Sequence, residues 1–73
     1  MNTFKIRAYG KSELALLYFP AASSAHTAVN HLMAWIKRCT ELWKKLHDMG
    51  YAKSGKFFTP REVALITEYL GTP

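Results

Sequence analysis

The sequence predicts a small, mostly α domain of three to four helices, whose first two helices are arranged like a helix-turn-helix. The helices stand either alone or together with one short two-stranded β element. Two observations predict this class. Apolar residues recur at helical spacing through most of the chain. Capping and turn signals made of Pro, Gly, Ser or Thr separate these segments. At 73 residues, the whole chain, 1–73, is expected to form a single helical domain.

The first expected element is a short β-strand. Residues 3–9 alternate apolar and polar side chains, which places Phe4, Ile6 and Ala8 on one side and two basic residues on the other. An isolated strand needs a partner, and residues 56–58, which are aromatic and follow a Ser-Gly turn signal, are the expected one.

Two or three helices are expected before residue 50. The first covers residues 11–19, because Pro20 disfavours a helical backbone in the residue before it. Ser24 is the expected N-cap of the second. Residues 24–49 form either one long helix or two, since Thr40 is equally able to cap a third helix.

A buried stripe runs along this region at the spacing of one helix face. It consists of Val29, Leu32, Trp35, Ile36 and Cys39, and on an unbroken helix it continues through Leu42, Trp43 and Leu46. Gly50 is expected to end the helix in a left-handed conformation, with Tyr51 packing back on Leu46.

The last helix has the clearest start signal. Thr59 as N-cap, Pro60 at the first helical position and Glu62 at the third form a capping box. Its expected buried face consists of Val63, Ile66, Tyr69 and Leu70. The pattern of residues 58–66 repeats that of residues 9–17, with an aromatic residue, a glutamate four positions later and an apolar run. Shared capping chemistry explains this match, since repeat architectures normally need three or more copies.

Charge indicates a polyanionic partner. Ten Lys and Arg against five Asp and Glu give a net charge of +5 and a pI near 9.6. One basic group would form a stripe on a continuous helix, interleaved with acids, and consists of Lys37, Arg38, Lys44 and Lys45. A second group gathers if the strand and the later loop are neighbours, and consists of Lys5, Arg7, Lys11, Lys53, Lys56 and Arg61.

A helix-turn-helix order predicts that the second helix enters the major groove of DNA. The base-contacting candidates are His26, Thr27, Asn30 and His31, and the phosphate-contacting candidates are Lys37, Arg38, Lys53, Lys56 and Arg61. The alternative is a protein–protein interaction module, either a homodimer or a partner-binding domain without nucleic-acid contact, because the core is thin and aromatic residues are plentiful.

Other function classes are not expected. A single cysteine, Cys39, forms no internal disulfide, which fits a reducing compartment, and with no signal peptide or membrane-spanning run the expected location is cytoplasmic. No zinc-ligand spacing, phosphate loop or catalytic pair is present, so we expect no enzyme activity, cofactor, metal, membrane contact or small-molecule substrate.

Several segments together resemble a family of short basic proteins from gut anaerobic bacteria that is classed as a domain of unknown function. They cover residues 4–15, 17–20, 35–39, 50–51, 58–63 and 69–73. More distantly, Glu13-Leu14-Ala15 followed by Trp35-Ile36-Lys37-Arg38 is similar to the first two helices of excisionase and MerR-type DNA-binding domains. The connection in this chain is longer than in those domains. The resemblance implies a bacterial, mobile-element setting.

Overall fold

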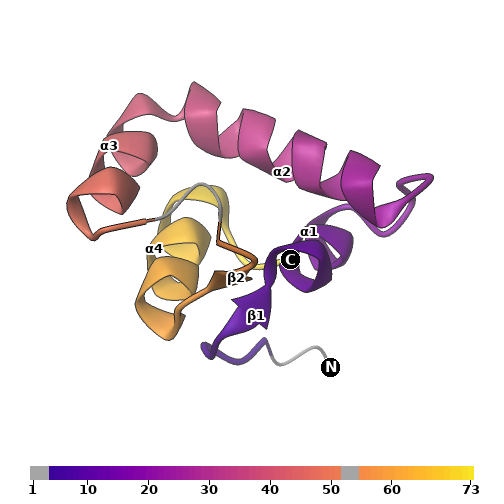
Figure 1. Ribbon diagram of the computed structural model, residues 1–73, viewed down its shortest axis with the longest axis horizontal. Helices are drawn as coiled ribbons and strands as arrows, with labels where there is room; N and C mark the ends of the chain where they lie inside the picture. The colour runs from indigo at the N-terminus through magenta and orange to yellow at the C-terminus, as the bar shows by residue number, and fades with distance from the viewer. Residues whose placement is uncertain (1–3, 52–54) are drawn as a thin grey trace.

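The computed structural model describes residues 4–51 and 55–73, and it confirms a mostly helical domain with a short two-stranded sheet. The elements are β1 (Tyr9–Gly10), α1 (Lys11–Tyr18), α2 (Ala25–Arg38), α3 (Thr40–Asp48), β2 (Phe57–Phe58) and α4 (Pro60–Leu70). Figure 1 shows α2 along one side of the molecule and the two strands on the opposite side. Helices α1 and α4 lie between them, since each contacts both α2 and one of the strands.

The sheet joins the starts of two helices. Strands β1 and β2 pair antiparallel, with Tyr9 opposite Phe58 and Gly10 opposite Phe57. The Lys11 N–H extends this pairing by donating to the Lys56 carbonyl at 2.9 Å. Because β1 leads directly into α1 and β2 leads through one residue into α4, this small sheet fixes the N-terminal ends of both helices side by side. The predicted partner of the first strand is therefore confirmed.

The predicted extent and orientation of that first strand are wrong. Ile6 is 49% exposed and Ala8 is exposed, whereas Tyr9, which the alternation placed on the polar side, is buried. The preceding residues turn back over Tyr9, whose hydroxyl donates to the Lys5 carbonyl at 2.8 Å and whose ring stacks on Phe4 at 5.2 Å between centroids. With only two paired residues, the ladder is too short to impose alternation on this segment.

The core is formed by side chains from every element. Buried apolar residues on the helices are Leu14 and Ala15 of α1, Ala28, Leu32 and Ile36 of α2, Leu42 and Leu46 of α3, and Val63 and Ile66 of α4. The strands and loops contribute Tyr9, Tyr51 and Phe58. On α2 and α3 these positions are four residues apart, so each helix turns one narrow face inward.

The chain forms two helices between residues 24 and 49, with a break at Cys39. Cys39 has an extended backbone (φ −87°, ψ 90°) and takes the N-cap position of α3, so Thr40 is the first helical residue and not the cap. On one continuous helix, Leu42 would lie about 240° around the axis from Ile36. The break allows both to face the same core.

The buried stripe predicted along α2 is only partly confirmed. Leu32 and Ile36 are buried as expected, but Trp35 is 42% exposed, and Val29 and Cys39 are only half-buried. Ala28 takes the inward position instead. The predicted stripe on α2 is therefore right at Leu32 and Ile36 and wrong at Trp35.

The end of α3 follows the prediction. Gly50 has φ +89°, and its N–H donates to the His47 carbonyl at 3.0 Å. The Tyr51 N–H donates to the Leu46 carbonyl at 3.0 Å, and both side chains are buried in the core. These two hydrogen bonds form a Schellman motif, which satisfies the last carbonyls of the helix.

The start of α4 also follows the prediction. Thr59 Oγ1 accepts from the Glu62 N–H at 3.2 Å, and Glu62 Oε1 accepts from the Thr59 N–H at 2.8 Å. At the matching position of α1, Glu13 Oε1 accepts from the Gly10 N–H at 3.2 Å. The repeated sequence pattern thus marks two helices that start with the same glutamate contact, and their aromatic residues face each other across the sheet.

Candidate nucleic-acid interface

The outward face of α2 contains six of the residues predicted to contact nucleic acid. At about 100° per residue, all six lie at least 100° around the helix axis from Leu32, the centre of the buried face. We call this surface the α2 face, and it consists of His26, Thr27, Asn30, His31, Lys37 and Arg38. All of them except Thr27, which is half-buried, are exposed. The structure therefore brings these six residues to one side of one helix.

Charge on α2 has one sign only. Its 14 residues include no Asp or Glu, and its last turn contains Lys37 and Arg38. Basic residues at this end interact favourably with the partial negative charge of the helix C-terminus. An anion that approaches the α2 face meets no carboxylate on that helix.

Thr27 has a structural contact that sequence reasoning did not foresee. Ser24 caps α2 by accepting from the Thr27 N–H at 3.1 Å, as predicted for the cap. The Thr27 hydroxyl in turn lies 3.0 Å from Ser24 Oγ and 3.4 Å from Ser23 Oγ. Thr27 therefore belongs to the capping cluster, and base contact would have to compete with these hydrogen bonds.

His31 lies at a pocket that the sequence did not predict. Its ring is 5.4 Å from that of Phe19, which also meets Trp35 edge to face at 4.7 Å between centroids. The pocket has a volume of about 370 Å³ and is lined by Tyr18, Phe19, Pro20, Ala21, Ala22 and His31. Pro20 and the alanines beside it were the available signal, because small residues after a short helix leave room between it and the next one.

The basic stripe was predicted on the condition of a continuous helix, and the break at Cys39 means that this condition is not met. Lys37 lies in the last turn of α2, with its ammonium 5.6 Å from the centre of the Trp43 ring on α3. Lys45 lies 5.2 Å from the Tyr69 ring, and hydrogen bonding to the Tyr69 hydroxyl raises its pKa. Two of the four basic residues therefore pack on aromatic rings across helix boundaries, and Arg38 is left at the end of the α2 face.

The second basic group gathers around the sheet, as the sequence predicted on condition that strand and loop are neighbours. We call this surface the strand end, and its described residues are Lys5, Arg7, Lys11, Lys56 and Arg61. Lys53, the remaining predicted member, lies outside the described residues. The strand end and the α2 face lie on opposite sides of the molecule (Figure 1), so the two groups do not form one surface.

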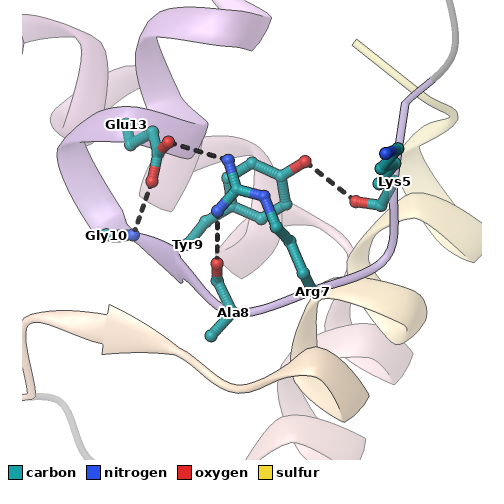
Figure 2. A network of polar contacts seen from close by, with 6 residues as sticks. All are labelled: Lys5, Arg7, Ala8, Tyr9, Gly10 and Glu13. Atoms are coloured by element: carbon teal, nitrogen blue, oxygen red, sulfur yellow. Dashed lines mark hydrogen bonds and ion pairs between the residues drawn. The ribbon is translucent and has the colours of Figure 1, made fainter.

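Arg7 is held in a network at the strand end (Figure 2). Its guanidinium lies 2.9 Å from Glu13 Oε2, donates to the Ala8 carbonyl at 2.7 Å, and covers the Tyr9 ring at 3.8 Å. The hydrogen bond from Arg7 lowers the pKa of Glu13 and raises that of Arg7, and the Gly10 amide further lowers that of Glu13. This carboxylate is fully engaged by Arg7 and the backbone of β1.

The remaining cations of the strand end differ in their contacts. The Lys11 ammonium lies 4.6 Å from the centre of the Tyr51 ring and 5.7 Å from that of Phe58. Lys56 and Arg61 are exposed, on either side of an aromatic residue, Phe57, that is itself 70% exposed. The sequence did contain a signal for this exposure, since two adjacent aromatic residues in a strand face opposite sides.

Two further features bear on the kind of site. Among the described side chains, no three His, Cys, Asp or Glu form a group that could hold a metal ion. Within residues 4–51 and 55–73, no helix is both long and apolar enough to cross a lipid bilayer.

The fold and its two basic surfaces define a small basic helical domain. The model of one protein family, described as a domain of unknown function (DUF4248), matches residues 5–73, and the chain belongs to that family. The resemblance to an uncharacterised family is thereby confirmed. No curated protein and no solved structure matches the chain.

Proposed function

We propose that this chain is a DNA-binding domain whose α2 face enters the major groove. The observation that supports this most is the composition of α2, where 14 residues contain no acid and end in two cations. The outward position of His26, Asn30 and His31 adds side chains that donate and accept hydrogen bonds. An α-helix with such a face fits the width of the major groove.

The two kinds of side chain have separate roles in this proposal. Lys37 and Arg38 contact phosphates, which fixes the register of the helix on the duplex without reading sequence. Asn30 and the two histidines contact base edges, and an asparagine pairs best with the N6 and N7 atoms of adenine. The α1–α2 connection spans residues 19–24, longer than the three to four residues of the usual motif, so α1 braces α2 in a related but distinct arrangement.

The role we propose is accessory or regulatory and not catalytic. The similarity of Glu13-Leu14-Ala15 and Trp35-Ile36-Lys37-Arg38 to excisionase and MerR-type domains supports it, together with the bacterial, mobile-element setting which that similarity implies. A domain of this kind acts by occupying or shaping a DNA site for other proteins.

The proposal is tested by measuring the affinity of the chain for a fluorescent mixed-sequence DNA duplex at a series of salt concentrations. We expect the double variant Lys37→Glu, Arg38→Glu to bind at least tenfold more weakly at about 100 mM salt, and to lower the slope of log K against log salt by about 2. The matched control is Lys44→Glu, Lys45→Glu, which changes the net charge equally but on α3. It should retain most of the affinity.

Two outcomes would reject this function. One is the absence of duplex binding even at low salt. The other is equal weakening by both double variants, because the effect would then depend on net charge and not on the α2 face.

A protein–protein interaction is the second candidate, and one observation favours it. Helices α1 and α2 carry exposed apolar side chains: Leu17 is 45% exposed, Leu16 37% and Trp35 42%. Apolar surface of this kind is typical of contacts between chains. A homodimer is tested by measuring the mass of the chain by analytical sedimentation at concentrations from about one to several hundred micromolar. A constant monomer mass over that range would rule out the homodimer.

A further inference from the structure

The strand end contains an exposed aromatic ring that the fold does not use. Phe58 faces the core and is fully buried, so Phe57, its neighbour in β2, faces the other side of the sheet. Across the sheet, Phe57 is paired with Gly10, which has no side chain to cover it. Its ring carbons lie 3.8 and 3.9 Å from the position that a Cβ on Gly10 would take, so the ring rests against β1 while the side chain stays 70% exposed.

The charged residues that flank this ring in the chain are basic. Lys56 precedes it in the chain, and Arg61 follows in the first turn of α4; both are exposed, and neither makes an ion pair within the described residues. The carboxylates of the adjoining helix starts are already engaged. Glu13 contacts Arg7 and the Gly10 amide, and Glu62 is buried in its capping box.

We propose that Phe57, Lys56 and Arg61 form a second nucleic-acid site, which binds single-stranded DNA by stacking the Phe57 ring on an unpaired base. An exposed ring that has exposed cations before and after it in the chain provides the two contacts that single strands need, a surface for the flat face of a base and charges for the phosphates. A purely apolar ligand would leave both cations without a counter-charge, and a polyanion without bases would leave the Phe57 ring exposed to water. Single-stranded DNA satisfies both. The site lies opposite the α2 face and does not rest on the duplex binding proposed above.

This site is tested by titrating the full chain into a fluorescent oligothymidine and measuring binding from the fluorescence anisotropy. We expect Phe57→Ala to weaken binding about tenfold, Phe57→Leu to weaken it nearly as much, and Phe57→Trp to stay within about twofold of the wild type. Leucine keeps the apolar area but has no aromatic face, so the comparison separates stacking from apolar contact. Leu17→Ala, another exposed apolar residue, is the matched control and should have no effect.

The cations are tested separately. Lys56→Gln and Arg61→Gln should each weaken oligothymidine binding and lower the slope of log K against log salt by about 0.7. The thermal unfolding midpoint of the Phe57 variants should stay within a few degrees of the wild type, because the ring is largely exposed. The α2 variant Lys37→Glu, Arg38→Glu should keep binding oligothymidine, and Phe57→Ala should keep binding duplex.

Three results would overturn the site. The first is that Phe57→Ala binds oligothymidine like the wild type, and the second is that Phe57→Leu does so. Either result would mean that no base stacks on the ring. The third is a chain that binds anionic vesicles but no oligothymidine, which would assign this surface to a membrane. Loss of duplex binding in the α2 variant has no bearing on any of these readouts, so the two proposals fail independently.

Discussion

Gly50 is a single residue on which the end of α3 depends. Its φ of +89° lies in the left-handed region, and no atom lies within 4 Å of the position that an added Cβ would take. A side chain at this position would therefore clash with nothing, and its cost would come from the backbone conformation alone. The sequence allowed this prediction because the Schellman motif involves only residues within one turn of the helix end.

Replacing Gly50 tests that reading. Gly50→Ala should lower the free energy of unfolding by about 1 kcal/mol, and Gly50→Asn by clearly less, because asparagine tolerates the left-handed region. Urea unfolding of the three proteins measures this. Equal losses for both variants would contradict a purely conformational cost.

Tyr18 makes a contact that its position in the sequence does not reveal. Its hydroxyl donates to the Gly71 carbonyl, 53 residues away, and so ties the end of α4 to the end of α1. Burial raises the pKa of Tyr18 from 10.0 to about 12. The neutral hydroxyl is therefore favoured in the folded state.

This shift predicts a pH dependence at the alkaline end. The unfolded chain loses the Tyr18 proton near pH 10 and the folded chain near pH 12, so the stabilisation is complete below pH 10 and is lost as the pH rises toward 12. Between pH 9 and pH 11.5, the urea concentration at the unfolding midpoint should fall further for the wild type than for Tyr18→Phe. Other groups that titrate in this range are common to both proteins and cancel in the comparison.

Among the helices, the start of α4 and the break between α2 and α3 differ in how far the sequence predicts them. The α4 cap is made by Thr59 and Glu62, three residues apart, so a local pattern is sufficient. The break at Cys39 has no Gly or Pro to mark it. A stripe through Trp35, Cys39 and Trp43 fits one continuous helix, and the positions of Leu42 and Leu46 fit two helices equally well. The local pattern therefore does not decide between them, whereas in the folded chain α3 packs against both α2 and α4.

Two threonines test the assignment of the caps. Thr59→Ala should lower the free energy of unfolding by about 1 kcal/mol, because it removes the acceptor for the Glu62 amide. Thr40→Ala should change it by a few tenths at most, since Cys39 occupies the cap of α3 and Thr40 is exposed. Thermal or urea unfolding of both variants measures the difference. A larger loss at Thr40 would mean that the α3 boundary is wrong.

At the scale of the molecule, the decisive feature is the separation of the two basic surfaces. Their composition follows from the sequence, and the grouping of Lys37 with Arg38 or of Lys56 with Arg61 needs only local structure. Their placement on opposite sides does not follow from the sequence, because it depends on Tyr9 pairing with Phe58, 49 positions later, and on α1 and α4 filling the space between. The exposure of Phe57 depends on the same pairing.

The α2 face also shows where local reasoning about a site fails. His26, Asn30 and Lys37, which the sequence named as contact candidates on the second helix, are all exposed and lie on its outward side. Helical spacing gave no warning that Thr27 would join the Ser24 cap or that His31 would pack on Phe19. These contacts arise from the connection before α2, whose conformation the sequence pattern did not predict.

Binding of duplex DNA by the α2 face can be measured by titrating the ¹⁵N-labelled chain with a mixed-sequence duplex and following the amide chemical shifts. We expect the largest shift changes on α2, at residues on the side away from Leu32, and little change at the strand end. Changes confined to the strand end, or to the α1–α2 connection around Phe19, would contradict this expectation.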